Sequence, residues 1–187
     1  MDFKDLPLSR LTDLIALPSP SPGGGAVCAL TAAMAAGIVA MVSGLGKAAG
    51  TPSARARVQQ ALALRDSLLD DAQRDSDSYA AYMQAKALPP GPDKEAQVEA
   101  ALKAAIDVPL EIATRALQVL PIMEEARPHC PRSALPDAQV AGLLLRAAAK
   151  GCILNARINL TMLKNEASRA LNLAYADSLE READVHA

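Results

Sequence analysis

Aromatic side chains are nearly absent from this chain of 187 residues, which has one Phe, three Tyr and no Trp. Few rings are therefore available to stack on nucleic acid bases, and a formal net charge of -2 provides no excess of Lys and Arg for a phosphate backbone. Nucleic acid is accordingly not an expected partner. Strands favour aromatic and β-branched residues, so the same scarcity argues against a sheet.

Histidine and cysteine are also scarce, with two and three residues respectively. His129 lies in a proline-rich segment and His186 is the penultimate residue, so neither is placed for Ser/His/Asp or Cys/His catalysis. Cys28, Cys130 and Cys152 are far apart and form no C-x-x-C pair, which predicts neither a disulfide framework nor a metal site. The N-terminus lacks the basic and then apolar order of a signal peptide, so we expect a cytoplasmic protein.

Alanine is abundant instead and supplies 40 of the 187 residues. Ala, Leu, Glu, Lys, Arg and Gln all favour helices, and a chain of this length can bury one substantial core. No internal repeat and no long linker divides the sequence. We therefore predict an all-α fold, a single-domain bundle of long helices that spans residues 1–187.

Residues 14–46 form a run of 33 positions without a charged side chain. The part from Ala26 to Leu45 is long enough to cross a membrane. Its bulk is Ala with Gly37 and Gly44, which gain little from lipid, whereas Leu-rich runs are what insertion favours. We therefore interpret this segment as a buried Ala/Gly-rich second helix of the bundle rather than as a membrane span.

The charge-free run is interrupted at residues 20–25, Pro-Ser-Pro-Gly-Gly-Gly. Two prolines followed by three glycines do not begin a regular helix, so we expect the second helix to start at Ala26. Glycines let main-chain N–H groups approach a ligand closely, and the first turn of a helix leaves such groups unpaired, with the positive end of the helix dipole behind them. This junction is therefore a candidate site for an anion or an oxygen-rich ligand.

Proline, glycine and capping signals divide the rest of the chain into four further helices. They are expected over residues 7–17, 51–88, 93–121 and 137–177. Asp93 and Asp137 are interpreted as N-caps, and Pro109 is expected to bend its helix because it lacks a backbone N–H.

The helix expected over residues 51–88 carries a carboxyl group within an apolar face. Spacings of four and three residues place on this face Leu68, Ala72, Asp75, Tyr79 and Tyr82. Burial would raise the pKa of Asp75 toward the range that suits general acid–base catalysis. The alternative is that the face lies at a solvated edge, where Asp75 pairs with a surface charge such as Arg74.

The last expected helix repeats this pattern with amides. Ala148, Cys152, Asn155 and Asn159 follow one another at spacings of four, three and four. Two Asn side chains on one face can bind a flat heterocycle with lactam-type groups, since each offers a donor and an acceptor. The alternative is that they form hydrogen bonds between helices inside the bundle.

Five motifs follow one another along the chain. They are Pro-x-Pro-Gly-Gly-Gly at 20–25, Met-Val-x-x-Leu-x-Lys at 41–47, Asp-x-x-x-Tyr at 75–79, Ala-x-x-Val-Pro-Leu at 105–110 and Asn-x-x-Ile-Asn-Leu at 155–160. Together these motifs resemble the cyclodeaminase/cyclohydrolase family of folate enzymes over residues 7–165. This all-helical family includes the C-terminal half of formiminotransferase-cyclodeaminase and stand-alone methenyltetrahydrofolate cyclohydrolases.

The resemblance implies a homodimer with a reduced folate as its substrate, no cofactor beyond that tetrahydrofolate, and no metal. The leading expectation is hydrolysis of 5,10-methenyltetrahydrofolate to 10-formyltetrahydrofolate, because no formiminotransferase domain is attached to supply a formimino substrate. One alternative is cyclodeamination of 5-formiminotetrahydrofolate with release of ammonia. Another is a helical protein of the same fold that binds folate without catalysis.

The resemblance also implies functional positions, with Asp75 as the catalytic residue. The implied substrate-binding residues are Pro22, Gly23, Gly24, Gly25, Lys47, Asp137, Asn155 and Asn159. The two amides are expected on the pterin and Lys47 on the glutamate tail. The chain departs from the family pattern at Ala26, where Ser is expected, at Ile106, where Thr is usual, and after the Leu-Pro turn at 88–89, where an Arg is missing. These departures motivate the non-catalytic alternative.

Overall fold

The computed structural model describes residues 2–46 and 48–185. The regular structure of these residues is helical, and the all-α prediction is confirmed. The α-helices are α1 (Leu8–Ile15), α2 (Gly24–Gly44), α3 (Pro52–Ala87), α4 (Pro92–Ala126), α5 (Leu135–Leu160) and α6 (Glu166–Val185). Short 3₁₀ helices lie at Phe3–Asp5, Arg127–His129 and Arg132–Ala134.

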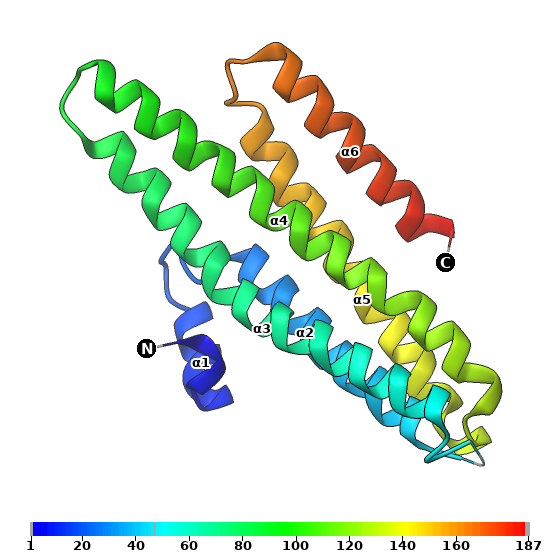
Figure 1. Cartoon of the computed structure of the whole chain (residues 1–187). Helices are drawn as coiled ribbons and strands as arrows, with labels where there is room; N and C mark the ends of the chain where they lie inside the picture. Colours follow the sequence, from blue (N-terminus) through cyan, green and yellow to red (C-terminus); the bar gives the residue numbers. More distant parts are fainter. Residues whose placement is uncertain (1, 47, 186–187) are drawn as a thin grey trace.

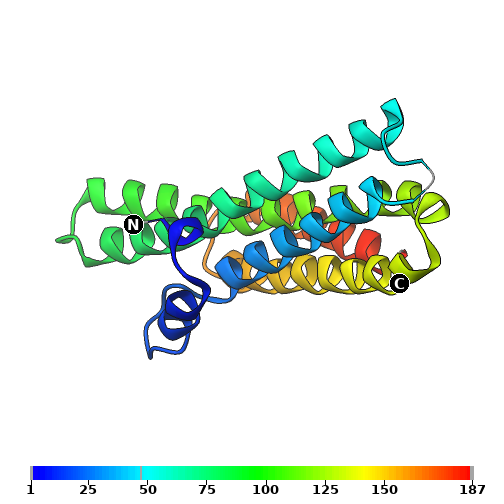
Figure 2. The same cartoon turned by 90° about the horizontal axis from the view of Figure 1, so that it is seen from below.

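Four of the helices form two layers (Figures 1 and 2). α3 and α4 make a long antiparallel hairpin, and α2 and α5 pack side by side against it. α6 runs back along α5 and also contacts α4, whereas the short α1 stands outside the bundle near the start of α2. The α3–α4 hairpin extends well past the N-terminus of α2, so one end of the bundle is built without α2.

Small side chains let α2 pack against three neighbours. Its buried residues are mostly alanine, so α3, α4 and α5 can all approach its backbone closely. Within the described part of the chain, α2 is also the one helix long and apolar enough to cross a membrane by length and composition. The prediction of a buried Ala/Gly-rich second helix is confirmed.

The start of α2 differs from the expected one by two residues. The helix begins at Gly24 rather than at Ala26, and Gly23 is its N-cap with an extended backbone. The first N–H groups of any helix lack a partner within it, so Gly24 and Gly25 can enter the first turn without losing a hydrogen bond. The glycines therefore belong to the helix terminus itself.

α4 differs from expectation at both ends. It begins directly after Gly91, so Asp93 is not the N-cap and lies in the first turn, where its charge favours the helix dipole. Pro109 and Pro121 lie inside the helix, which continues to Ala126. The predicted end at Pro121 was wrong because buried side chains on both sides of it pack into the core, and this packing offsets one lost hydrogen bond.

The last expected helix is in fact two helices. α5 ends at Leu160, and residues 161–165 turn the chain so that α6 returns along α5. Arg157 of α5 forms ion pairs with Asp177 and Glu180 of α6, both with N–O distances of 2.7 Å. Sequence patterns missed the turn because residues 161–165 contain neither Gly nor Pro.

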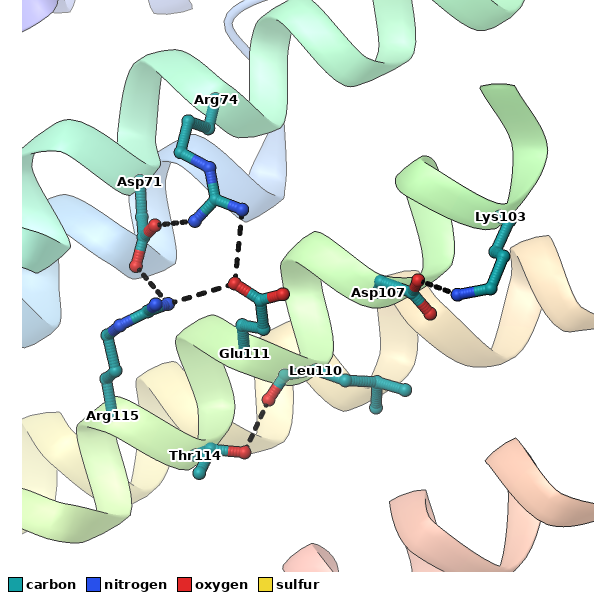
Figure 3. A network of polar contacts seen from close by, with 8 residues as sticks. All are labelled: Asp71, Arg74, Lys103, Asp107, Leu110, Glu111, Thr114 and Arg115. Carbon is teal, nitrogen blue, oxygen red and sulfur yellow. Dashed lines mark hydrogen bonds and ion pairs between the residues drawn. The ribbon is translucent and has the colours of Figure 1, made fainter. Parts of the chain in front are cut away.

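An ion network joins α3 to α4 (Figure 3). Asp71 of α3 is only 2% exposed and accepts hydrogen bonds from Arg74 of its own helix and Arg115 of α4, at 2.5 and 2.8 Å. Glu111 accepts from the same two guanidinium groups at 3.1 and 3.3 Å. A buried carboxylate is costly without partners. α3 and α4 therefore pack so that the guanidinium groups of Arg74 and Arg115 both bond to Asp71.

Candidate active site

A cleft lies at the N-terminus of α2, where α3, α4 and α5 continue past it. Its volume is about 330 Å³. α3 contributes a carboxyl group and hydroxyl groups, α5 contributes two amides, and the start of α2 contributes glycine backbone. The lining residues are Pro20, Ser21, Gly23, Gly24, Gly25, Asp75, Ser76, Ser78, Tyr79, Ala105, Pro109, Asn155, Ile158 and Asn159.

The carboxyl group of Asp75 occupies the space where a side chain at position 25 would lie. A Cβ atom at Gly25 would be 2.3 Å from Oδ1 of Asp75, and one at Gly24 would be 3.4 Å from Nδ2 of Asn155. Asp75 also accepts a hydrogen bond from the backbone N–H of Ala26. A first-turn donor of α2 is therefore paired with a side chain of α3. The Pro-Gly junction and the Asp75 face, far apart in sequence, form one contact.

Asp75 differs from Asp71, which lies one helical turn earlier. Asp71 is held by two guanidinium groups (Figure 3), whereas Asp75 makes no ion pair within the described residues. Burial raises the pKa of Asp75 to about 6, and the hydrogen bond from Ala26 opposes only part of this rise. The expected alternative, a pair with Arg74, is wrong because Arg74 bonds to Asp71 and Glu111 instead. A carboxyl group with this pKa can both accept and donate a proton near neutral pH.

Pro109 explains the position of one of the two amides. Proline has no N–H, so the carbonyl group four residues earlier, that of Ala105, loses its helical partner. Nδ2 of Asn159 donates to this carbonyl oxygen at 2.8 Å across the α4–α5 interface. The structure thus supports the interhelical interpretation for Asn159. Asn155 makes no side-chain hydrogen bond within the described residues, and its amide is available to a ligand in the cleft.

The structure brings most of the predicted site together, and two of the described site residues do not line the cleft. The cleft is lined by Gly23, Gly24, Gly25, Asp75, Asn155 and Asn159. Pro22 is buried outside the lining and follows a cis peptide bond. Asp137 is the third residue of α5 and not its N-cap, and at 1.5 Å per residue it lies about 27 Å from Asn155. Lys47, the residue expected on the glutamate tail, lies outside the described residues.

Three further side chains of α3 line the cleft beside Asp75, namely Ser76, Ser78 and Tyr79. The hydroxyl group of Ser78 donates to the Asp75 carbonyl, while the buried hydroxyl group of Ser76 has no partner in the described residues. Tyr79 follows Asp75 by four residues, and this helical spacing was the signal for it. Ser76 gives no comparable signal, because serine occurs on both exposed and buried faces.

Two of the departures from the family pattern do not reach the cleft. Ala26 is fully buried and contacts Asp75 through its backbone N–H, which any residue except proline supplies. Ile106 is 1% exposed and belongs to the hydrophobic core. Neither side chain lines the cleft, so neither departure removes a group from it.

Together these features define an all-helical protein with a small-molecule site that suits acid–base chemistry. The site offers a carboxyl group of raised pKa, an available amide and the backbone of a helix N-terminus, around a cleft of small-molecule size. The sequence matches the formiminotransferase-cyclodeaminase family over residues 7–177, and the chain belongs to this family.

The names of individual similar proteins are consistent with this family. A methenyltetrahydrofolate cyclohydrolase from Methylorubrum extorquens is 31% identical over an alignment of 187 positions, which covers 94% of this chain and 89% of that protein. A formimidoyltransferase-cyclodeaminase from Mus musculus is 30% identical over 183 residues, which cover 90% of this chain but only 33% of that protein. The crystal structure of a formiminotetrahydrofolate cyclodeaminase from Thermotoga maritima has a TM-score of 0.90 at 24% identity, over 99% of this chain and 93% of that chain. This structure shows that the fold is shared.

Proposed function

We propose that this protein is an enzyme that hydrolyses 5,10-methenyltetrahydrofolate to 10-formyltetrahydrofolate. The observation that carries the proposal is the position of Asp75. Its carboxyl group has a pKa of about 6 and lies in the cleft against Gly25, in a cavity that Asn155 also lines. The identity of 31% to a protein named as this cyclohydrolase, over most of both chains, supports the same reaction.

The substrate is electrophilic enough to need little help from the protein. Its reacting carbon joins N5 and N10 as an amidinium cation, whose charge ionised Asp75 stabilises. Asp75 accepts a proton from the water that attacks this carbon, and a C–O bond forms. The bond from the carbon to N5 then breaks as N5 takes the proton from Asp75. The second proton of the water leaves to solvent as the formyl carbonyl group forms.

The other groups of the cleft serve binding in this proposal. Asn155 offers a donor and an acceptor to the pterin ring, and the backbone of Gly23 to Gly25 lies beside the reacting part of the substrate. No cofactor beyond the tetrahydrofolate substrate is required, because water and one carboxyl group complete the reaction.

Loss of the methenyl chromophore on addition of purified protein tests the reaction. The wild-type kcat/KM is expected to rise through about pH 6, because Asp75 of the free enzyme has to be ionised. Asp75→Asn is expected to lower kcat by about 100-fold or more. The matched control is Asp77→Asn on the same helix, whose carboxylate is exposed and accepts from Gln73. A wild-type rate equal to that of buffer rejects the activity, and an unimpaired Asp75→Asn variant rejects the role of Asp75.

Cyclodeamination of 5-formiminotetrahydrofolate is the second candidate. The observation in its favour is the 30% identity to the mouse protein over 90% of this chain. The chemistry takes place at the same carbon, and protonated Asp75 can give its proton to the departing ammonia. Ammonia release from the formimino substrate, without hydrolysis of the methenyl compound, would favour this reaction. Thermal stabilisation by folate without any turnover would instead favour a binding protein.

We further propose a cytoplasmic homodimer, formed through the outer face of α2 and α5. These helices lie side by side in Figure 2, and their exposed apolar residues are Met34, Met41, Val140, Leu143, Leu154 and Ile158. An exposed apolar face of this kind supports a protein interface. Ile158 also lines the cleft, so a partner on this face would approach the rim of the cleft. Three free cysteines are compatible with a reducing compartment.

A further inference from the structure

A second cavity lies beyond the catalytic cleft, toward the end of the bundle that α2 does not reach. Its volume is about 370 Å³. The first turns of α4 form one wall, and residues 162–164, which follow α5, form the other. Figure 1 shows that the α3–α4 hairpin and the turn between α5 and α6 lie at this same end of the molecule.

The two cavities follow the same face of α4. Lys94, Val98, Leu102, Ala105 and Pro109 recur at spacings of four, four, three and four, which places them in one row along the helix. The first three line the second cavity and the last two line the cleft. The row therefore runs from one cavity into the other.

The C-terminal end of α5 supports the same continuity. Ile158 and Asn159 line the cleft, and one helical turn later Met162 and Leu163 line the second cavity. The two spaces thus lie end to end between α4 and the end of α5. A long ligand seated in the cleft would follow this row of α4 to reach the second cavity.

The second cavity combines an apolar middle with cations. Val98 and Leu102 provide apolar surface, and the two ammonium groups are those of Lys94 and Lys164. Nζ of Lys94 donates to the carbonyl oxygen of Leu88 at 2.7 Å, which fixes its position and leaves its charge without a counterion. Neither lysine forms a salt bridge within residues 2–46 and 48–185. Apolar surface beside two ammonium groups suits a ligand in which an aromatic ring is followed by carboxylates.

Two carboxyl groups, those of Glu95 and Glu99, also line the second cavity. Both residues are exposed, whereas Lys94 is half-buried. Because neither carboxylate pairs with Lys94 or Lys164 in the described residues, a bound anion does not have to break an existing ion pair. The carboxylates disfavour a compact, highly charged anion such as a phosphate.

We propose that this second cavity binds the p-aminobenzoylglutamate arm of the reduced folate. The aminobenzoyl ring lies on Val98 and Leu102, and the glutamate carboxylates bind Lys94 and Lys164. Lys94 and Ala105 are 11 positions apart, which is about 16 Å at 1.5 Å per residue and is comparable with the extended arm. The inference rests on the proposed function in that the pterin of the same molecule occupies the cleft.

Kinetics with two substrates test this subsite. The double variant Lys94→Gln/Lys164→Gln is expected to raise KM for 5,10-methenyltetrahydrofolate about tenfold with kcat unchanged, because the lost contacts act equally in the ground and transition states. The pteroate analogue, which lacks the glutamate, should show no such change. Lys103→Gln on α4 is the matched control, since this lysine pairs with Asp107. Equal KM changes for both substrates, or none for either, would overturn the proposal.

A binding experiment separates this subsite from the catalytic proposal. The probe is p-aminobenzoyl-L-glutamate, which has no reacting carbon, and NMR titration of the wild type gives its affinity whether or not the protein is active. The double variant is expected to bind it about tenfold more weakly, while Lys103→Gln binds as the wild type does. Unchanged affinity in the double variant would reject the subsite even in an active enzyme. If the wild type has no hydrolytic activity but the double variant still binds the probe about tenfold more weakly, the reaction is rejected and the subsite is kept.

Discussion

At the scale of single residues, the absence of a side chain at Gly25 makes room for the buried carboxyl group of Asp75. Gly25 has no Cβ, and the space is filled by the carboxyl group of Asp75, which also receives the N–H of Ala26. The acid is thereby held against the start of α2 without a cation beside it. Burial raises the pKa of both Asp75 and Asp71, but only Asp71, one turn away, is tied to two guanidinium groups that oppose the rise.

Gly25→Ala is expected to displace Asp75. The new Cβ would lie 2.3 Å from Oδ1, so either the carboxyl group moves or α2 and α3 separate. We expect a loss of activity close to that of Asp75→Asn, and a fall of about 1–3 kcal/mol in the free energy of unfolding measured with urea. The control is Gly37→Ala in the same helix, where a Cβ meets nothing within 4 Å. This control should gain about 0.5–1 kcal/mol, and a fully active Gly25→Ala variant would contradict the proposed contact.

Asp75→Asn is expected to stabilise the protein above pH 6. The pKa of Asp75 is about 6 in the folded chain and about 3.9 when unfolded, so the folded chain binds more protons between these values. Stability of the wild type therefore falls as pH rises from about 4 to 6. Removing the ionisable group should gain about 3 kcal/mol at pH 7 and well under about 1 kcal/mol at pH 4, which denaturation at both pH values measures. A gain independent of pH would show that burial of this charge is not its cause.

At the scale of helices, a proline of α4 and an asparagine of α5 form a complementary pair. Pro109 frees the carbonyl group of Ala105, and Asn159 supplies the donor that the helix lacks. Asn159→Ala is expected to cost about 1–2 kcal/mol in the free energy of unfolding, because it leaves a buried carbonyl group without a partner. In a Pro109→Ala background the restored N–H bonds to Ala105 itself, so the same substitution should cost little. A double-mutant cycle measures this coupling, and equal costs in both backgrounds would refute it.

Helix content followed from composition, whereas helix ends depended on tertiary contacts. Proline and glycine signals correctly predicted the boundaries of α3, since Thr51 caps it and Pro89 follows its end. The same rules ended α4 at Pro121 and missed the turn after Leu160, because packing against neighbouring helices overrides local propensity there. The family resemblance implied Asp137 as a substrate-binding residue, and only the structure shows that it lies about 27 Å from Asn155 along α5.

Residues of the cleft could be predicted where a local rule was broken. Asp75 interrupts an apolar face and the Pro-Gly segment interrupts the charge-free run before α2, and both irregularities mark the cleft. The second role of Pro109, as the partner of Asn159, depends on the alignment of α4 with α5 and has no local signature. The same is true of the cavity at Lys94 and Lys164, which come from elements 70 positions apart.

At the scale of the whole molecule, the outer face of α2 and α5 is unusually apolar. Met34 is 58% exposed, Leu143 is 61% exposed, and α2 carries no charge along its length. The variant Met34→Glu/Leu143→Glu is expected to shift the protein from dimer to monomer in analytical ultracentrifugation, because it places four carboxylates in a twofold interface. Leu171→Glu on α6, where the leucine is 73% exposed, is the control and should leave the mass unchanged. A wild-type monomer at high concentration would contradict the proposed dimer.

A shift of α5 along α4 by one helical turn would carry Asn155 about 5.4 Å away from its place in the cleft beside Gly24. The hydrogen bond from Asn159 to the carbonyl of Ala105 is directional and has one position in which it can form. This hydrogen bond therefore opposes a shift of α5 along α4. Together with the buried Leu and Ile side chains of α4 and α5, one proline thus fixes how the groups of the cleft face each other.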